Sequence, residues 1–184
     1  MAKAYVLMNC DMGNEKKIIS KLNAINGVTE THGTFGLYDI FSKVEADDEE
    51  GIQKIVTGSI RQMPEIHSTM TLTRSECEDL FPSVEKKDFV SEKNTSQAYV
   101  VIHTDKGEEY EVLKNLSHIS EVREADVVFG FYDVLCKIET NDYDSLEKVI
   151  TKSIRGLPHI ITSMTLNVIV EQEEWWFNSK NNRH

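Results

Sequence analysis

The sequence predicts an α+β protein built from one small βαββαβ module that is present twice in tandem. The first observation is an internal repeat, because the run that begins at Ala4-Tyr-Val aligns with the run that begins at Ala98-Tyr-Val. The alignment continues without a gap to Leu72 over Leu166, and about two positions in five are identical. The second observation is that strand-like runs alternate with helical patterns in the same order in both copies. We therefore interpret the chain as a duplication.

The first half of each module is predicted to be a strand followed by an amphipathic helix. Residues 4–9 form a β-favouring run without Gly or Pro, which suits a buried central strand. Apolar residues at helical spacing indicate the helix that follows, and Gly27 ends it in the first copy. The apolar stripe consists of Ile18, Ile19, Leu22 and Ile25 in the first copy and of Val112, Leu113, Leu116 and Ile119 in the second.

Two strands, a second helix and a last strand complete the module. The two strands are expected within residues 28–45, on either side of a tight turn at Gly36. The acidic run 47–50 suits the positive N-terminal end of a helix, and Pro64 stops that helix. A last strand over residues 66–73 gives the order βαββαβ, which is the ferredoxin-like arrangement.

The two modules are expected to pack sheet to sheet as an intramolecular pseudo-dimer. Helices cover only one face of a ferredoxin-like sheet, whereas residues 5–8 and 99–102 carry no charged side chain on either face. The uncovered face must be buried, and the other module offers a matching surface. The predicted organisation is a first module over 1–74, a linker over 75–97, a second module over 98–170 and a tail over 171–184. The tail contains Trp175-Trp176-Phe177, which we expect to pack on a partner or to cap a sheet edge.

Composition narrows the class of function. A net charge of −11, without a cluster of Lys and Arg, argues against direct nucleic-acid binding. The apolar runs are far shorter than the roughly 18 residues of a membrane-spanning helix, and the N-terminus shows no signal-peptide pattern. The three cysteines, Cys10, Cys77 and Cys136, form no CxxC pair, which suits a reducing compartment. We therefore expect a cytoplasmic protein that does not associate with membranes.

One edge of each predicted sheet gathers polar side chains. The end of the first strand, the turn between the second and third strands, and the start of the last strand meet at that edge. The segments are 10–13, 35–39 and 67–69 in the first copy and 103–105, 129–133 and 161–163 in the second. A carboxylate, a phenol, hydroxyls and turn amides can hold a small zwitterion. Each residue also fits a structural role, since Gly36 suits a turn with positive φ that Tyr38 and Asp39 could fix.

Each copy resembles the effector-binding domain of the Lrp/AsnC family of regulators, known as the RAM domain. The resemblance covers nearly all of both copies, and its specific parts are the Gly-x-Tyr-Asp and Ser-Thr segments. It is carried in the first copy by Ile25-Asn-Gly-Val28, Phe35-Gly-Leu-Tyr-Asp39, Lys43-Val-Glu-Ala and Ile66-His-Ser-Thr69.

The resemblance implies a regulatory protein that binds a small molecule. In that family the domain dimerises through its sheet, assembles into larger rings and binds amino acids or similar molecules between dimers. The implied ligand contacts are Gly36, Tyr38, Asp39, Ser68, Thr69, Gly130, Tyr132, Asp133, Thr162 and Ser163. Typical members carry an N-terminal helix-turn-helix, whereas the first strand here begins at Ala4, so we expect a stand-alone tandem version without its own DNA-binding domain. Ser68-Thr69 is replaced by Thr162-Ser163 in the second copy, so two equal sites are not assumed.

A metal site is one alternative, because several Cys and His residues fall at or near the same sheet edges. The candidate ligands are Cys10, His32 and His67 in the first copy and His103, Asp126 and His159 in the second. Thiolate and imidazole ligands would suit copper or zinc, but no compact CxxC or HxxH spacing supports such a site.

An enzyme and an interaction module are two further classes of function. An enzyme is not expected, since there is no nucleophile–base pairing, no Gly-rich phosphate loop and no HExxH motif. No cofactor other than copper or zinc is expected. An interaction module remains an alternative: the chain would form a homo-oligomer or co-assemble with related full-length regulators through a sheet edge or through Trp175-Trp176-Phe177.

Overall fold

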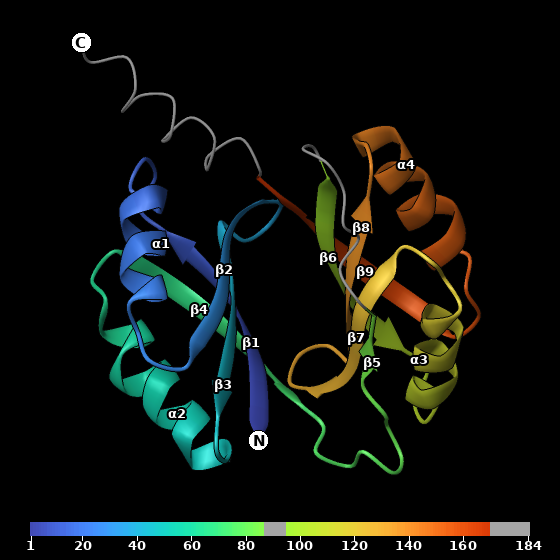
Figure 1. Ribbon diagram of the computed structural model, residues 1–184, viewed down its shortest axis with the longest axis horizontal. Coiled ribbons are helices and arrows are strands. Elements are labelled where there is room, and N and C mark those ends of the chain that lie inside the picture. The colour runs from blue at the N-terminus through green and yellow to red at the C-terminus, as the bar shows by residue number, and fades with distance from the viewer. Residues whose placement is uncertain (87–94, 170–184) are drawn as a thin grey trace.

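The computed structural model describes residues 1–86 and 95–169, which form two α+β modules with helices on their outer sides (Figure 1). The first module consists of β1 (Ala2–Cys10), α1 (Glu15–Asn23), β2 (Val28–Phe35), β3 (Ile40–Ala46), α2 (Glu49–Gly58), the 3₁₀-helix η1 (Ile60–Gln62) and β4 (Ile66–Arg74). The second consists of β6 (Ser96–Thr104), α3 (Glu109–Ser117), β7 (Val122–Phe129), β8 (Val134–Thr140), α4 (Tyr143–Lys148), the π-helix η2 (Val149–Ile154) and β9 (Ile160–Val168). The predicted βαββαβ order is confirmed in both copies.

The two sheets are joined to each other at both edges. The strand order is β4-β1-β3-β2 in the first module and β9-β6-β8-β7 in the second. Strand β2 pairs with β9, where Phe35 lies opposite Asn167, and β4 pairs with β7, where Thr73 lies opposite Phe129. The strands therefore close on themselves, and each module covers edges that would otherwise be open for pairing with another chain.

The structure contains three apolar cores, one within each module and one between the two modules. Two of them lie between a sheet and its own helices, as the amphipathic stripes predict. The third lies between the two sheets and contains Tyr5, Leu7, Phe41, Leu72, Tyr99, Val101, Val128, Leu135 and Leu166. At its centre the rings of Phe41 and Tyr99 stack with centroids 3.7 Å apart. The expected sheet-to-sheet packing of an intramolecular pseudo-dimer is confirmed.

The second helix of each module starts in the same way but ends differently. Asp48 and Asp142 cap α2 and α4, and each accepts a hydrogen bond from the backbone N–H three residues later, at Gly51 (2.8 Å) and Ser145 (2.7 Å). After α2 the chain tightens into the 3₁₀-helix η1, whereas α4 widens into the π-helix η2. This difference between the copies is not foreseen from the sequence pattern.

The segment between the modules contributes a strand of its own. Strand β5 (Val84–Glu85), within the expected linker, pairs with Ala125 and Glu124 on β7. The expected contacts of Trp175-Trp176-Phe177 lie outside the described residues. Across 1–86 and 95–169, none of the helices has the length and apolar character required to cross a membrane.

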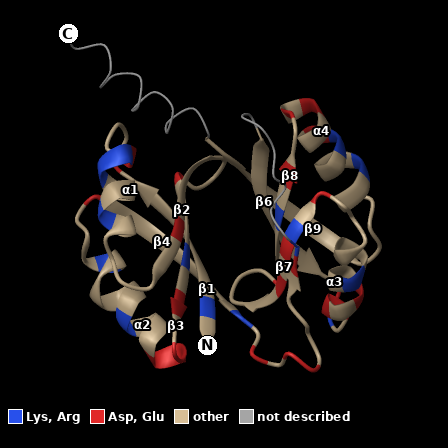
Figure 2. Ribbon diagram, in the orientation of Figure 1, with Lys and Arg blue, Asp and Glu red and all other residues tan. Residues whose placement is uncertain are grey.

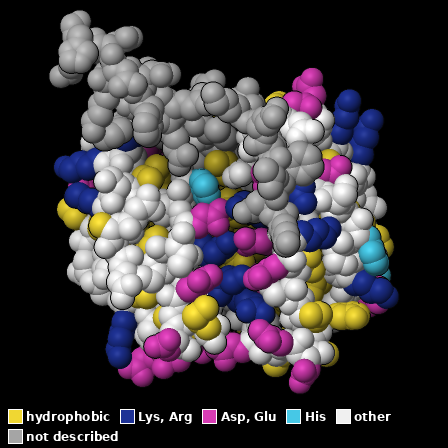
Figure 3. All heavy atoms as spheres, viewed as in Figure 1, with side chains coloured by type: hydrophobic (Ala, Val, Ile, Leu, Met, Phe, Trp, Pro, Cys, Tyr) yellow, Lys and Arg dark blue, Asp and Glu magenta, His cyan; other side chains and the backbone are white. Residues whose placement is uncertain are grey.

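One end of the space between the two sheets carries charged side chains instead of apolar ones (Figures 2 and 3). We call this set the interface charge cluster; it consists of Lys3, Glu30, Lys43, Arg74, Glu124, Asp126 and Lys137. Its ion pairs, except Lys43–Glu30, cross from one module to the other: Lys43 lies 2.7 Å from Glu124, and Lys137 lies 2.9 Å from Glu30. The duplication thus places complementary charges on the two facing sheets.

Glu30 is held in its ionised form by this cluster. Its carboxylate accepts hydrogen bonds from His32 (2.7 Å), from Lys137 (2.9 Å) and from the Tyr99 hydroxyl, and Lys43 lies 2.9 Å from its second oxygen. Burial acts to raise the pKa of Glu30, but the hydrogen bonds and positive charges around it outweigh burial and hold that pKa well below its ordinary value.

We expect the free energy of unfolding to decrease as the pH falls below about 4.5, the ordinary pKa of a glutamate. The folded state binds fewer protons at Glu30 than the unfolded state does, so this contribution is present above pH 4.5 and is lost as the pH falls toward the folded pKa. Urea denaturation between roughly pH 3 and pH 7 measures the effect. Glu30→Gln should flatten the pH dependence, and an unchanged slope in that variant would contradict the assignment.

Candidate functional site

In the first module the three segments expected at one sheet edge meet around the end of β1. The backbone N–H of Asp39 donates to the carbonyl of Met8 at 2.9 Å, and the Asp39 carboxylate accepts from the backbone N–H of Cys10 at 3.0 Å. The turn is closed by Thr34, whose N–H donates to the Asp39 carbonyl at 2.8 Å. Asp39 therefore ties the turn after β2 to the end of β1, which is the structural role considered for it.

The hydroxyls of Ser68 and Thr69 lie on the other side of β1. Ser68 is opposite Asn9 in the β1–β4 register and accepts from the Asn9 side-chain amide at 3.3 Å. Thr69 is opposite Met8, and its hydroxyl accepts from Arg61 Nε at 2.9 Å. Two strand spacings of about 4.8 Å separate Asp39 from this pair. A ligand touching both groups would therefore span the end of β1.

The second module repeats this geometry with an added histidine. The Asp133 carboxylate accepts from the Thr104 backbone N–H at 2.9 Å, as Asp39 does from Cys10. Across the central strand, Thr162 lies opposite His103 and Ser163 lies opposite Ile102. His103 Nδ1 is 3.5 Å from Asp133 Oδ2, so the imidazole lies directly beside the carboxylate.

The aromatic side chains of the two sites face the space between the modules. Tyr38 and Tyr132 are partly buried against the core between the sheets. The Tyr132 ring stacks on His103 with centroids 4.4 Å apart, and its hydroxyl lies 3.9 Å from Met164 Sδ. Burial, reinforced by the nearby Tyr38, raises the pKa of Tyr132, so its phenol is a hydrogen-bond donor at neutral pH.

The two turn glycines touch the opposite module, which sequence reasoning missed. A Cβ on Gly36 would lie 2.9 Å from the carbonyl oxygen of Thr165, and a Cβ on Gly130 would lie 2.9 Å from that of Thr71. Each turn therefore sits directly against the last strand of the other copy. No local motif reveals this contact, because it depends on how the two sheets pack. Each candidate site thus lies where both modules meet.

The histidines proposed as metal ligands in the sequence each contact a different side chain instead of one another. His67 Nε2 lies 2.5 Å from Asp11, His32 bonds Glu30 in the interface charge cluster, and His103 stacks on Tyr132. Burial, followed by the nearby Asp39 carboxylate, raises the pKa of the Cys10 thiol to about 11, which disfavours the thiolate that binds metal.

The second-copy candidates are also separated. Asp126 belongs to the interface charge cluster, whereas His159 Nδ1 lies 3.3 Å from Asp105. Within the described ranges, the structure contains no group of three or more His, Cys, Asp or Glu side chains arranged to hold a metal ion.

Comparisons with known proteins agree with the two-module architecture. The sequence model of the Lrp/AsnC ligand binding domain matches residues 3–75 and again residues 97–174. No curated protein matches the chain. The solved structure of FFRP-DM1 is 36% identical and covers 41% of this chain and 100% of its own, with a TM-score of 0.40.

Two further structures are similar over one module or over both. A hypothetical protein, PHS023 from Pyrococcus horikoshii, is also 36% identical over 41% of this chain and 90% of its own, with a TM-score of 0.40. The siroheme decarboxylase NirDL is 10% identical, covers 96% of this chain and 77% of its own and has a TM-score of 0.63, so it shares the fold of the paired modules. Because the family model accounts for both modules, the chain belongs to the Lrp/AsnC ligand-binding domain family.

Proposed function

We propose that the chain is a regulatory protein whose effector is an amino acid bound at the two sheet edges. The observation that carries this proposal is the placement of Asp39 and Asp133. Each carboxylate uses one oxygen to accept a backbone N–H at the end of the central strand. The Asp133 side chain is still 37% exposed, so a charged oxygen remains accessible at a fixed position.

The surrounding groups suit a zwitterion. The fixed carboxylate provides a partner for an ammonium group, and charged hydrogen bonds of this kind contribute about 1.5–3 kcal/mol. The hydroxyls of Ser68 and Thr162 lie across the central strand, where they can meet the ligand carboxylate. His103 lies beside Asp133, whereas Asn9 stands in its position in the first module, so the two sites differ chemically and we expect unequal affinities.

Asp39→Asn and Asp133→Asn should weaken amino-acid binding by about tenfold or more at their own sites, because the charge that pairs with the ammonium is removed. The amide oxygen can still accept the backbone N–H, so the fold should be retained. A thermal-shift screen of the amino acids selects the effector, since ligand at 100 times Kd adds about 2.7 kcal/mol of stability. Calorimetry with the selected amino acid then compares the variants. Unchanged affinity in the double variant would reject these sites.

We also propose that the chain assembles with further copies, or with related regulators, through the turns after β2 and β7. Those turns expose Phe35 (71%), Leu37 (74%), Phe129 (62%) and Phe131 (67%). Large apolar side chains grouped around a ligand site are typical of an interface.

Light scattering of the full chain measures this assembly. We expect a species larger than 21.0 kDa that Leu37→Ser and Phe131→Ser together return toward the mass of one chain. The proposal would be contradicted if the unmodified protein had the mass of a single chain and also failed to bind an added related regulator.

We further propose that the protein binds without catalysing a reaction, contacts no nucleic acid directly and resides in the cytoplasm. Its net charge of −11 opposes binding to phosphate backbones. Its three cysteines are free thiols, as in a reducing compartment. An electrophoretic mobility assay with duplex DNA tests the nucleic-acid part of this proposal. Binding of DNA by the isolated chain at physiological salt would contradict it.

A further inference from the structure

The chain that follows β4 covers the outer edge of β7 in the second module (Figure 1). It starts with the Ser75 N–H, which donates to the Val127 carbonyl at 2.9 Å. Strand β5 then pairs with β7 opposite Ala125, and the Lys86 N–H donates to the Arg123 carbonyl at 2.8 Å. The linker thus pairs with β7 at three successive outward-facing positions.

Part of the equivalent edge of β2 has no such cover among residues 1–86 and 95–169. On its outer side β2 pairs with β9 only at its last two residues, and the Gly33 carbonyl accepts from the Ile169 N–H at 2.9 Å. Because backbone groups alternate in direction along an antiparallel strand, Thr31 directs its N–H and C=O to the same side as Gly33. Thr31 corresponds to Ala125, which the linker covers. An open strand edge of this kind can pair with a further strand.

Apolar side chains beside this edge of β2 are less buried than their counterparts in the second module. Ile19 of α1 and Val28 of β2 are only partly buried. The equivalent residues Leu113 and Val122 are 2% and 0% exposed. Phe81 of the linker packs against the core that contains them. Within the part of the chain that the structure describes, the first module has no aromatic side chain in the place of Phe81.

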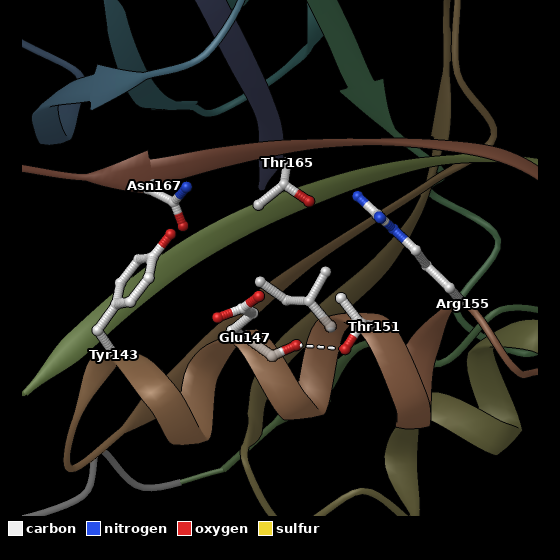
Figure 4. Close-up of a pocket in the computed structure, with 7 residues that line it drawn as sticks. Tyr143, Glu147, Thr151, Arg155, Thr165 and Asn167 are labelled. Atoms are coloured by element: carbon white, nitrogen blue, oxygen red, sulfur yellow. Dashed lines mark hydrogen bonds between the residues drawn. The ribbon is translucent and has the colours of Figure 1, made fainter.

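The C-terminal tail leaves β9 on the course that the linker follows from β4. Strand β9 runs along α4 and η2, toward which Thr165 and Asn167 point (Figure 4). It then reaches β2, where the Ile169 N–H donates to the Gly33 carbonyl. This bond repeats the linker bond between residues 75 and 127, because residue 169 lies 94 positions after 75 and residue 33 lies 94 positions before 127. The chain is therefore directed along the open edge of β2.

The tail repeats two linker residues that bind the second module. Phe81 packs against the core of that module, and Lys86 Nζ donates at 2.7 Å to the carbonyl of Ile119, just after α3. Lysines commonly bind the last carbonyls of a helix in this way. Trp175 and Lys180 stand 94 positions after Phe81 and Lys86. An aromatic side chain and a lysine thus follow the last strand at the same two distances in both segments.

We propose that residues 170–180 of this chain bind the open edge of β2 in the first module. Trp175 covers the partly buried side chains of α1 and β2, and the residues that follow it extend the sheet by pairing with the backbone of Thr31. Lys180 donates to the last carbonyls of α1. Each module then covers the edge of the other with the segment that follows its own last strand.

Tryptophan fluorescence of the full chain tests the proposal, because its only two tryptophans are Trp175 and Trp176. Trp176→Phe leaves Trp175 as the single reporter, and Leu37→Ser with Phe131→Ser keeps assembly through the turns out of the measurement. We expect the emission of a buried indole and weak quenching by acrylamide, both independent of protein concentration. The emission of a fully exposed indole would overturn the proposal. Emission that depends on protein concentration would also overturn it, because the tail would then bind a second copy.

Paired variants locate the contact. Ile25→Ser, next to the open edge, should make acrylamide quenching of Trp175 severalfold stronger, whereas Ile119→Ser, the equivalent change in the second module, should leave it unchanged. In hydrogen exchange, Trp175→Ala should make the Thr31 amide exchange about tenfold faster, because its hydrogen bond to the tail is lost. The amide of Ala125, beneath the linker, is the control and should not change. Equal effects of the two isoleucine variants, or an unchanged Thr31 amide, would overturn the assignment.

Discussion

Asp126→Ala is expected to lower the free energy of unfolding by about 3–5 kcal/mol, the range for breaking a buried ion pair by removing one partner. The Asp126 side chain is 1% exposed and lies 3.5 Å from Lys3 Nζ and 3.3 Å from Arg74 Nε, both from the first module. It also accepts hydrogen bonds from the hydroxyls of Tyr5 and Ser83. Removing the carboxylate leaves these four donors without their shared acceptor.

The Tyr5 hydroxyl shows why the loss is large. Burial, followed by the negative charge of Asp126, raises the pKa of Tyr5 well above its ordinary value. The phenol therefore stays protonated and donates its hydrogen to Asp126. Without the acceptor it becomes a buried donor with no partner, and each such group costs about 1–3 kcal/mol.

Urea denaturation measures the effect of Asp126→Ala, with Glu78→Ala as the matched control. Glu78 also pairs with Arg74, at 3.1 Å, but its side chain is 74% exposed. Surface pairs of this kind contribute at most about 1 kcal/mol, so the control should remain close to the unmodified protein. If the two variants lost equal stability, Asp126 would not be the centre of the cluster.

Gly36→Ala and Gly130→Ala are each expected to lower the free energy of unfolding by about 2–4 kcal/mol. The φ angles are +151° and +144°, which L side chains rarely adopt. The added methyl group would also lie 2.9 Å from a side-chain carbon, of Leu166 for Gly36 and of Leu72 for Gly130, besides the carbonyl oxygen there. Backbone strain and overpacking therefore act together and push the modules apart.

Thermal unfolding measures these glycine variants, and a decrease in Tm of roughly 4–16 °C is expected for a chain of this size. Gly107→Ala is the control, because Gly107 has φ of +87° but its Cβ would meet nothing within 4 Å. It should show only the loss from backbone strain, about 1 kcal/mol. An equal loss in all three variants would show that contact with the opposite module contributes nothing.

The tandem arrangement lets the two halves of the interface differ, which identical subunits related by a two-fold axis cannot do. The repeat places His32 where Asp126 stands, Gln97 where Lys3 stands and Val168 where Arg74 stands. Two copies of the second module facing each other would bury Asp126 without those cations. Within the interface charge cluster, the ion pairs of Asp126 with Lys3 and Arg74 therefore favour pairing of the first module with the second.

Much of the fold was predictable because it depends on local patterns repeated in the chain. The apolar stripes define the helices, the uncharged central strands require a second sheet, and the duplication supplies that sheet. The turns around Asp39 and Asp133 were also predictable, since each closes between adjacent strands of one module. The sequence did not predict which residues of the opposite module contact these sheet edges, because a motif within one module does not show what lies across from it.

The sequence by itself determined that there are two βαββαβ modules, the order of their elements, and that their sheets face each other. Only the tertiary structure decided which residues of one module meet which residues of the other. The contact of Gly36 with Thr165 and the burial of Asp126 among first-module cations both depend on it. The physical reason is that hydrophobic periodicity reports which face of an element is buried, whereas register and side-chain partners across an interface depend on close packing of distant segments.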